Sequence, residues 1–85
     1  MLHKFKKNFD FDLKFGVIEF VVSTTIPGSY TTREEISKSN KFSSAQIDLI
    51  KGLIKNQKVY FENIMILGPD GIKRQLGTVG FEITE

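Results

Sequence analysis

The strongest constraint on the fold is a β-hairpin signal in the second half of the chain. Residues 58–67 are rich in β-branched and aromatic side chains, which favour a strand. The sequence Gly-Pro-Asp-Gly follows at residues 68–71, and it has the proline, aspartate and glycine chemistry of a tight turn. We therefore predict a return strand over residues 72–76 and, after Gly77, a last strand that alternates to residue 83.

The first half of the chain carries three further strand patterns. Residues 9–15 alternate apolar and polar side chains, which is typical of a half-buried strand. Residues 16–26 are almost all apolar or β-branched, as in a strand that is covered on both faces. Pro27 and Gly28 indicate a turn, and the mixed charges of residues 30–38 favour a polar edge strand.

One helix is predicted between the two groups of strands, over about residues 43–55. Ser43 and Gln46 have the spacing of a capping box, in which each side chain bonds to the backbone of the other. Asn56 is the expected left-handed residue at the C-terminal end. An apolar stripe at helical spacing is expected to face the core, and it consists of Ile47, Ile50, Leu53 and Ile54.

Length and turn spacing define the fold class. A chain of 85 residues makes one domain at most, so we expect a single domain over residues 1–85, with residues 1–7 as a flexible terminal segment. The pattern predicts a mainly β domain, a sandwich or partly open barrel of about five to seven short strands, with the short helix closing one end.

Side chains suited to catalysis or cofactor binding are scarce. The chain has no cysteine, which excludes disulfides, thiol catalysis and cysteine-based zinc sites. The one histidine, His3, lies in the segment expected to be flexible, where a catalytic group cannot be positioned. Asp10 and Asp12 share a strand face, but no neighbouring residues supply the further oxygen ligands that calcium needs. We therefore predict no enzyme activity, no metal and no cofactor.

The charge balance gives little support for nucleic-acid binding. Twelve basic and ten acidic residues leave a formal charge of +2. The basic cluster at residues 3–7 is followed at once by Asp10 and Asp12, which repel phosphate groups. A small nucleic-acid-binding β domain is thus an alternative that depends on the pI near 9.0 alone. No signal peptide or membrane helix is recognisable in the sequence.

Several segments resemble, in order and spacing, the C-terminal domain of the GldM/PorM proteins of type IX secretion and gliding motility. Together they extend over nearly the whole chain. They are NFDFDLKF at residues 8–15, SAQI at 44–47, KVYFENI at 58–64, GPDG at 68–71, RQL at 74–76 and VGFEI at 79–83.

The resemblance implies an immunoglobulin-like β-sandwich that acts as the distal periplasmic module of an inner-membrane-anchored protein. Such a module binds periplasmic ring and lipoprotein components of the secretion machinery, with a homodimer as a possible form, and it has no catalytic or cofactor residues. A generic adhesin-like or ligand-binding β-sandwich of the envelope is the alternative. The residues that we expect to contact a partner, in the polar strand and at the hairpin tip, are Tyr30, Arg33, Pro69, Asp70, Lys73 and Arg74.

Overall fold

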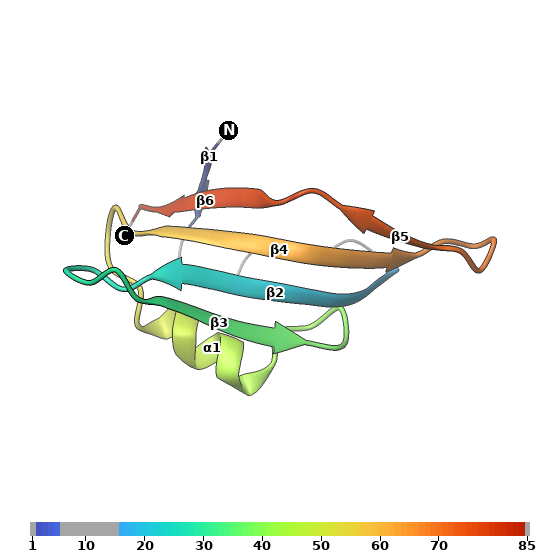
Figure 1. Cartoon of the computed structure of the whole chain (residues 1–85), viewed down its shortest axis with the longest axis horizontal. Coiled ribbons are helices and arrows are strands. Elements are labelled where there is room, and N and C mark those ends of the chain that lie inside the picture. Colours follow the sequence, from blue (N-terminus) through green and yellow to red (C-terminus); the bar gives the residue numbers. More distant parts are fainter. Residues whose placement is uncertain (1, 6–15, 85) are drawn as a thin grey trace.

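The computed structural model describes residues 2–5 and 16–84, and in these residues it shows six strands and one helix (Figure 1). In chain order the elements are β1 (Leu2–Phe5), β2 (Val17–Thr25), β3 (Thr32–Ser37), α1 (Ser44–Lys51), β4 (Lys58–Leu67), β5 (Lys73–Leu76) and β6 (Val79–Ile83). The prediction of a mainly β, sandwich-like domain with one short helix is confirmed.

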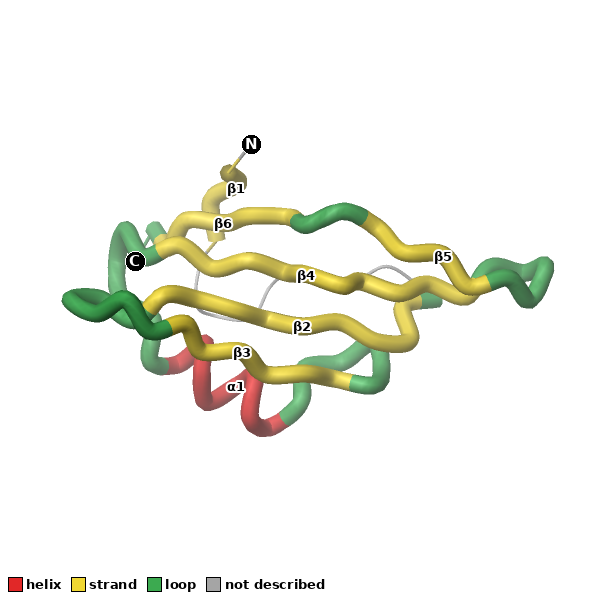
Figure 2. The backbone as a smooth tube through the Cα atoms, in the orientation of Figure 1, coloured by secondary structure: helices red, strands yellow, loops and turns green. Residues whose placement is uncertain are grey.

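The strands form one sheet in the order β1-β6-β4-β2-β3, with β5 paired to β4 outside this path (Figure 2). All pairs are antiparallel except β1 with β6. Both β5 and β6 pair with the same edge of β4. The register is continuous across the two strands, since Ile64 pairs with Leu76 and Phe61 with Val79. The predicted hairpin and the interruption at Gly77 are therefore confirmed.

The hydrophobic core lies between α1 and one face of the sheet. Three phenylalanine rings from neighbouring strands meet there: Phe20 stacks on Phe61 at 6.0 Å between centroids, and Phe81 meets Phe61 edge-on at 5.1 Å. Phe42, just before the helix, packs edge-on against Phe20 and Phe61. These rings bury large apolar areas in favoured aromatic geometries, so they hold the helix to the sheet.

In both β2 and β4, the alternation of buried and exposed residues is interrupted near the middle of the strand. In β4 the buried residues are Val59 and Phe61, then Ile64. Asn63 has a positive φ of 51°, which inserts an irregular step and keeps Ile64 on the core face. The β2–β4 register shifts on either side of Glu19, so the paired strand adjusts at the same level.

The N-terminal end of the helix follows the prediction. Gln46 donates its backbone N–H to Ser43 Oγ over 3.2 Å, and Ser43 donates its N–H to Gln46 Oε1 over 3.0 Å. This reciprocal pair is the capping box that the spacing of the two residues indicates.

The C-terminal end of the helix differs from the prediction. The helix ends at Lys51 with Gly52 as its C-cap, because Gly52 and the following residue fold into a tight turn on the last helical carbonyls. Asn56 is left-handed, with φ of 72°, but its N–H bonds to Ile83 rather than capping the helix. Ile54 lies beyond the shortened helix and is 57% exposed, while Leu49 occupies the core.

The sheet edges add one strand and shorten another. Residues 2–5 form β1 beside β6, within the segment of residues 1–7 whose flexibility stays a prediction. Pairing of this kind uses backbone N–H and C=O groups, so it does not require the apolar alternation that the segment lacks. The polar strand is an edge strand of the described sheet, as predicted, but β3 starts at Thr32. The strand predicted over residues 9–15 lies outside the described residues.

Candidate interaction surfaces

The β4–β5 turn is organised by Asp70. Its Oδ1 accepts the backbone N–H of Ile72 over 3.0 Å, and the N–H of Gly71 donates to the carbonyl of Gly68 over 3.0 Å. Gly71 has a φ of 77°, a conformation that side-chain-bearing residues seldom adopt. The Gly-Pro-Asp-Gly sequence thus closes the turn by the local chemistry that the sequence indicates.

Asp70 also forms an ion pair across the turn. Arg74 Nη2 lies 2.9 Å from Asp70 Oδ2, and Nη1 lies 3.4 Å from Oδ1. The hydrogen bond from Arg74, followed by that from the backbone of Ile72, lowers the pKa of the Asp70 carboxyl below its ordinary value. Both side chains are about half exposed, so the pair shapes the tip more than it stabilises the fold.

Exposed apolar side chains flank this ion pair. Leu67 is 42% exposed at the end of β4, and Ile72 is 53% exposed in the turn. Pro69 and Lys73 are also exposed. The tip therefore presents a mixed apolar and charged surface to solvent.

The β2–β3 turn presents an aromatic side chain to solvent. The N–H of Ile26 donates to the carbonyl of Thr31 over 2.9 Å, and the N–H of Ser29 donates to the carbonyl of Ile26 over 3.1 Å. Gly28 has a φ of 74°, which lets the chain reverse. Tyr30 lies in this turn, outside β3, and its relative exposure of 105% leaves the whole ring accessible.

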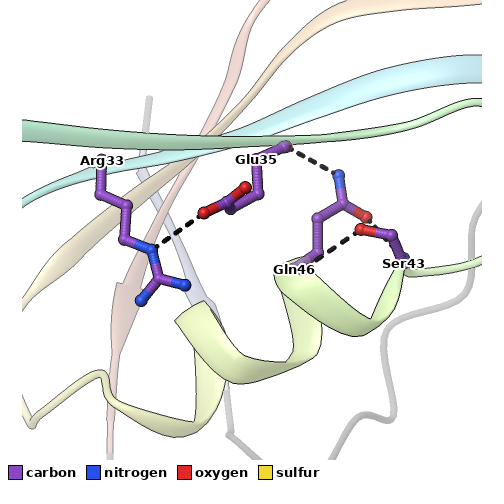
Figure 3. A network of polar contacts seen from close by, with 4 residues as sticks. All are labelled: Arg33, Glu35, Ser43 and Gln46. Atoms are coloured by element: carbon purple, nitrogen blue, oxygen red, sulfur yellow. Dashed lines mark hydrogen bonds and ion pairs between the residues drawn. The ribbon is translucent and has the colours of Figure 1, made fainter.

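Arg33 lies on β3 and faces the helix. Its Nε donates to Glu35 Oε2 over 3.1 Å, and both nitrogens at the end of its side chain point toward the C-terminal end of α1 (Figure 3). The backbone carbonyl of Glu35 accepts from Gln46 Nε2 over 3.0 Å. Glu35 thus positions the side chain of Arg33 near the end of the helix, and Glu35 is itself hydrogen-bonded to Gln46 on α1.

A cavity of about 230 Å³ lies at this position. Gln57 builds one wall, because its Nε2 donates to Thr24 Oγ1 over 3.0 Å and so joins the loop after α1 to the end of β2. Thr24 in turn donates to the carbonyl of Lys58 over 2.6 Å. The residues that line the cavity are Thr24, Ile26, Pro27, Arg33, Leu49, Gly52, Leu53 and Gln57.

The predicted contact residues fall into two groups at opposite ends of the sheet (Figure 1). Tyr30 and Arg33 lie at the β2–β3 end, and residues 69–74 form the β4–β5 tip. The cavity beside Arg33 was not expected from the sequence, because residues 24–33 and 49–57 meet only through tertiary contacts, which include the hydrogen bond from Gln57 to Thr24. Neither segment carries a local motif that reveals this contact.

Buried polar side chains are used within the fold. Ser23 Oγ donates to the Glu62 carboxylate, and Ser37 Oγ donates to the carbonyl of Lys41 over 2.5 Å. Gln46 has no exposed surface and bonds to three backbone groups. Each of these groups has a structural partner, so we assign them to stability.

The described ranges, residues 2–5 and 16–84, hold no group of three His, Cys, Asp or Glu side chains close enough to bind a metal ion. Within the same ranges, no helix has the length and apolar character needed to cross a bilayer.

The chain was compared with known protein families and with curated proteins. The family model of the GldM C-terminal domain matches residues 2–84. No curated protein matches the chain.

Proposed function

Because the chain belongs to the GldM C-terminal domain family, we propose that it is a non-enzymatic protein-interaction module of the type IX secretion and gliding machinery. The observation that carries the proposal is the family match over residues 2–84. The family is one of gliding motility and type IX secretion, and its partners belong to membrane-associated secretion and motility machinery.

The proposed function also includes a cellular location, binding partners and the bounds of the domain. The family suggests an envelope location, and we place the module in the periplasm as part of an inner-membrane-anchored protein. Its proposed partners are periplasmic ring components and outer-membrane lipoproteins, with a second copy of the chain as a further one. Residues 1–85 then form one domain of this kind.

The distribution of polar groups supports an interaction role. The buried polar side chains Ser23, Ser37 and Gln46 are bonded within the fold. The large side chains that remain exposed include Tyr30 and Ile72, each in a turn that projects from an end of the sheet. Tyrosine and arginine are enriched among the residues that dominate binding energy at interfaces. Tyr30 and Arg33 at the same end therefore favour this end as the main contact.

A pull-down from envelope extract of the source organism tests the proposal. The wild-type domain is the bait, and Tyr30→Ala and Asp48→Ala are the matched variants, because both side chains are exposed but only Tyr30 lies in a projecting turn. We expect mass spectrometry to recover periplasmic ring or lipoprotein components with the wild type and with Asp48→Ala, and less with Tyr30→Ala. Recovery of only cytoplasmic proteins, nucleic acid or glycans would contradict the proposal.

A further inference from the structure

The cavity at the end of α1 is large enough to hold one side chain of a bound peptide. Its volume of about 230 Å³ is below the roughly 300–1,000 Å³ that is usual for small-molecule sites. It is open on one side to solvent at Ile26, which is 41% exposed. A cavity of this size suits one side chain of a bound peptide better than an organic cofactor.

Three of the residues that line the cavity have polar or charged side chains, namely Thr24, Arg33 and Gln57. Leu49 and Leu53, both almost fully buried, form its base, and Ile26 and Pro27 form its outer wall. Thr24 and Gln57 are polar, but they are hydrogen-bonded to each other across the cavity wall. An aliphatic side chain placed here gains contact with the outer wall without leaving a polar group unpaired.

The residues that line the cavity include one cation, Arg33, and no aspartate or glutamate. The two lining segments, residues 24–33 and 49–57, contain three cationic residues and no aspartate or glutamate. The nearest acidic residues in sequence are Glu34 and Glu35, which follow Arg33, and Asp48, which is exposed on the helix. Glu35 is paired with the Nε of Arg33, and Glu34 is exposed on β3. The cationic residues are Arg33, Lys51 and Lys55. An acidic ligand complements this charge distribution.

Arg33 is positioned to bind a carboxylate beside the cavity. Glu35 contacts its Nε, and the two terminal nitrogens point toward the end of α1 (Figure 3). A guanidinium group offers several donors in a fixed plane and binds carboxylates through two parallel hydrogen bonds. The side chain of Arg33 is 42% exposed, so an incoming group can reach it.

We propose that this cavity binds an acidic peptide segment of a partner, with one aliphatic side chain against Ile26 and Pro27 and a neighbouring carboxylate paired with Arg33. The inference rests on the proposed interaction function and names the chemistry of the segment that the module recognises. Tyr30 lies in the same β2–β3 turn as Ile26 and Pro27 and is fully exposed.

Nuclear magnetic resonance titration tests the inference with defined probes. The probes are N-acetyl-Leu-Glu-amide, N-acetyl-Leu-Gln-amide and N-acetyl-Ala-Glu-amide, added to the ¹⁵N-labelled full chain. We expect the first probe to bind with a Kd of about 1 mM or weaker, a range typical of a single anchor, and to shift the amides of Ile26, Leu49 and Gly52. The other two probes should bind at least about five times more weakly, because each lacks one of the two contacts.

Variants separate the charge contact from general effects. Arg33→Gln should weaken the binding of the Leu-Glu probe about five- to tenfold but leave the binding of the Leu-Gln probe unchanged. Lys41→Gln, at an exposed lysine in the loop before α1, is the matched control and should change the binding of neither probe. Equal binding of all three probes, or shifts confined to residues outside the cavity, would overturn the inference. Because the probe comparison uses the wild-type chain, this conclusion does not depend on how a variant folds.

The same variants distinguish this inference from the proposed function. If envelope partners are captured equally by the wild type and by Arg33→Gln, the module binds partners but not through this cavity. If no envelope partner is captured while the Leu-Glu probe binds at the cavity, the proposed function fails and the recognition chemistry stands.

Discussion

The side-chain amide of Gln46 donates a 3.0 Å hydrogen bond to the backbone carbonyl of Glu35, which joins α1 to strand β3 (Figure 3). The same nitrogen donates to the carbonyl of Phe20 on β2 over 3.3 Å, while Oε1 accepts the N–H of Ser43. One buried amide therefore fastens the start of the helix to two neighbouring strands. Its two donors and its acceptor oxygen all have backbone partners.

Replacement of this amide should destabilise the fold strongly. Gln46→Ala removes the donors of two backbone carbonyls and half of the capping box, so we expect the free energy of unfolding to fall by about 2–4 kcal/mol. Urea denaturation followed by circular dichroism measures this change. Asp48→Ala, on the exposed side of the same helix, is the control and should stay within about 0.5 kcal/mol of wild type. A similarly small effect for Gln46→Ala would show that the amide does not secure the helix.

Asn63 should tolerate glycine better than a β-branched residue. Its φ of 51° is accessible to asparagine and glycine, but valine at this position is strained. We expect Asn63→Val to lower the free energy of unfolding by about 1–3 kcal/mol, and Asn63→Gly to remain within about 1 kcal/mol of wild type. Thermal unfolding of both variants provides the comparison. Equal loss in the two would mean that packing, rather than backbone conformation, decides this position.

The ion pair at the β4–β5 tip should be visible in the titration of Asp70. The pKa of Asp70 is lowered in the folded state, chiefly by Arg74. The pair therefore contributes to stability at pH values above the ordinary pKa of aspartate. That contribution is lost as the pH falls through the lowered pKa. Carboxyl ¹³C resonances should give a midpoint below the ordinary value in wild type, and a higher midpoint in Arg74→Gln. An unchanged midpoint in this variant would place the cause elsewhere in the turn.

The two ends of the sheet should contribute unequally to partner capture. Tyr30→Ala removes a fully exposed ring in the β2–β3 turn, and we expect it to weaken binding of the captured partner about tenfold. Charge reversal at the other end, Lys73→Glu with Arg74→Glu, should change the affinity less than about threefold at physiological salt, where distant exposed charges are screened. Affinities measured by biolayer interferometry show which end of the sheet makes the main contact with the partner. The reverse order would assign the main contact to the β4–β5 tip.

The features that the sequence predicts well are local ones. The Gly-Pro-Asp-Gly turn closes through bonds within residues 68–72, and the capping box links Ser43 to Gln46 only three residues away. Both depend on side chains reaching nearby backbone, so their residue types and spacing are sufficient evidence.

The features that the sequence does not predict depend on distant partners. Ile54 and Leu49 are both apolar, but Leu49 lies on the buried face of the helix, whereas Ile54 lies beyond its early end at Gly52 and is exposed. Similarly, Gln57 shows no local pattern, yet its bond to Thr24 joins residues 33 positions apart and builds the wall of the cavity. Arg33 is named from the sequence as a contact residue, but its position at this cavity emerges only from the packed structure.

The placement of the two turns has a mechanical consequence. The β2–β3 turn leaves the sheet at one end and the β4–β5 turn at the other, while β2 and β4 are antiparallel neighbours. Tension applied between partners held at the two turns would therefore pull β2 and β4 lengthwise past each other. Since backbone hydrogen bonds in an antiparallel ladder lie across the strands, this load is shared by the whole ladder in shear. The module would resist extension along its strands far better than peeling of its edge strands.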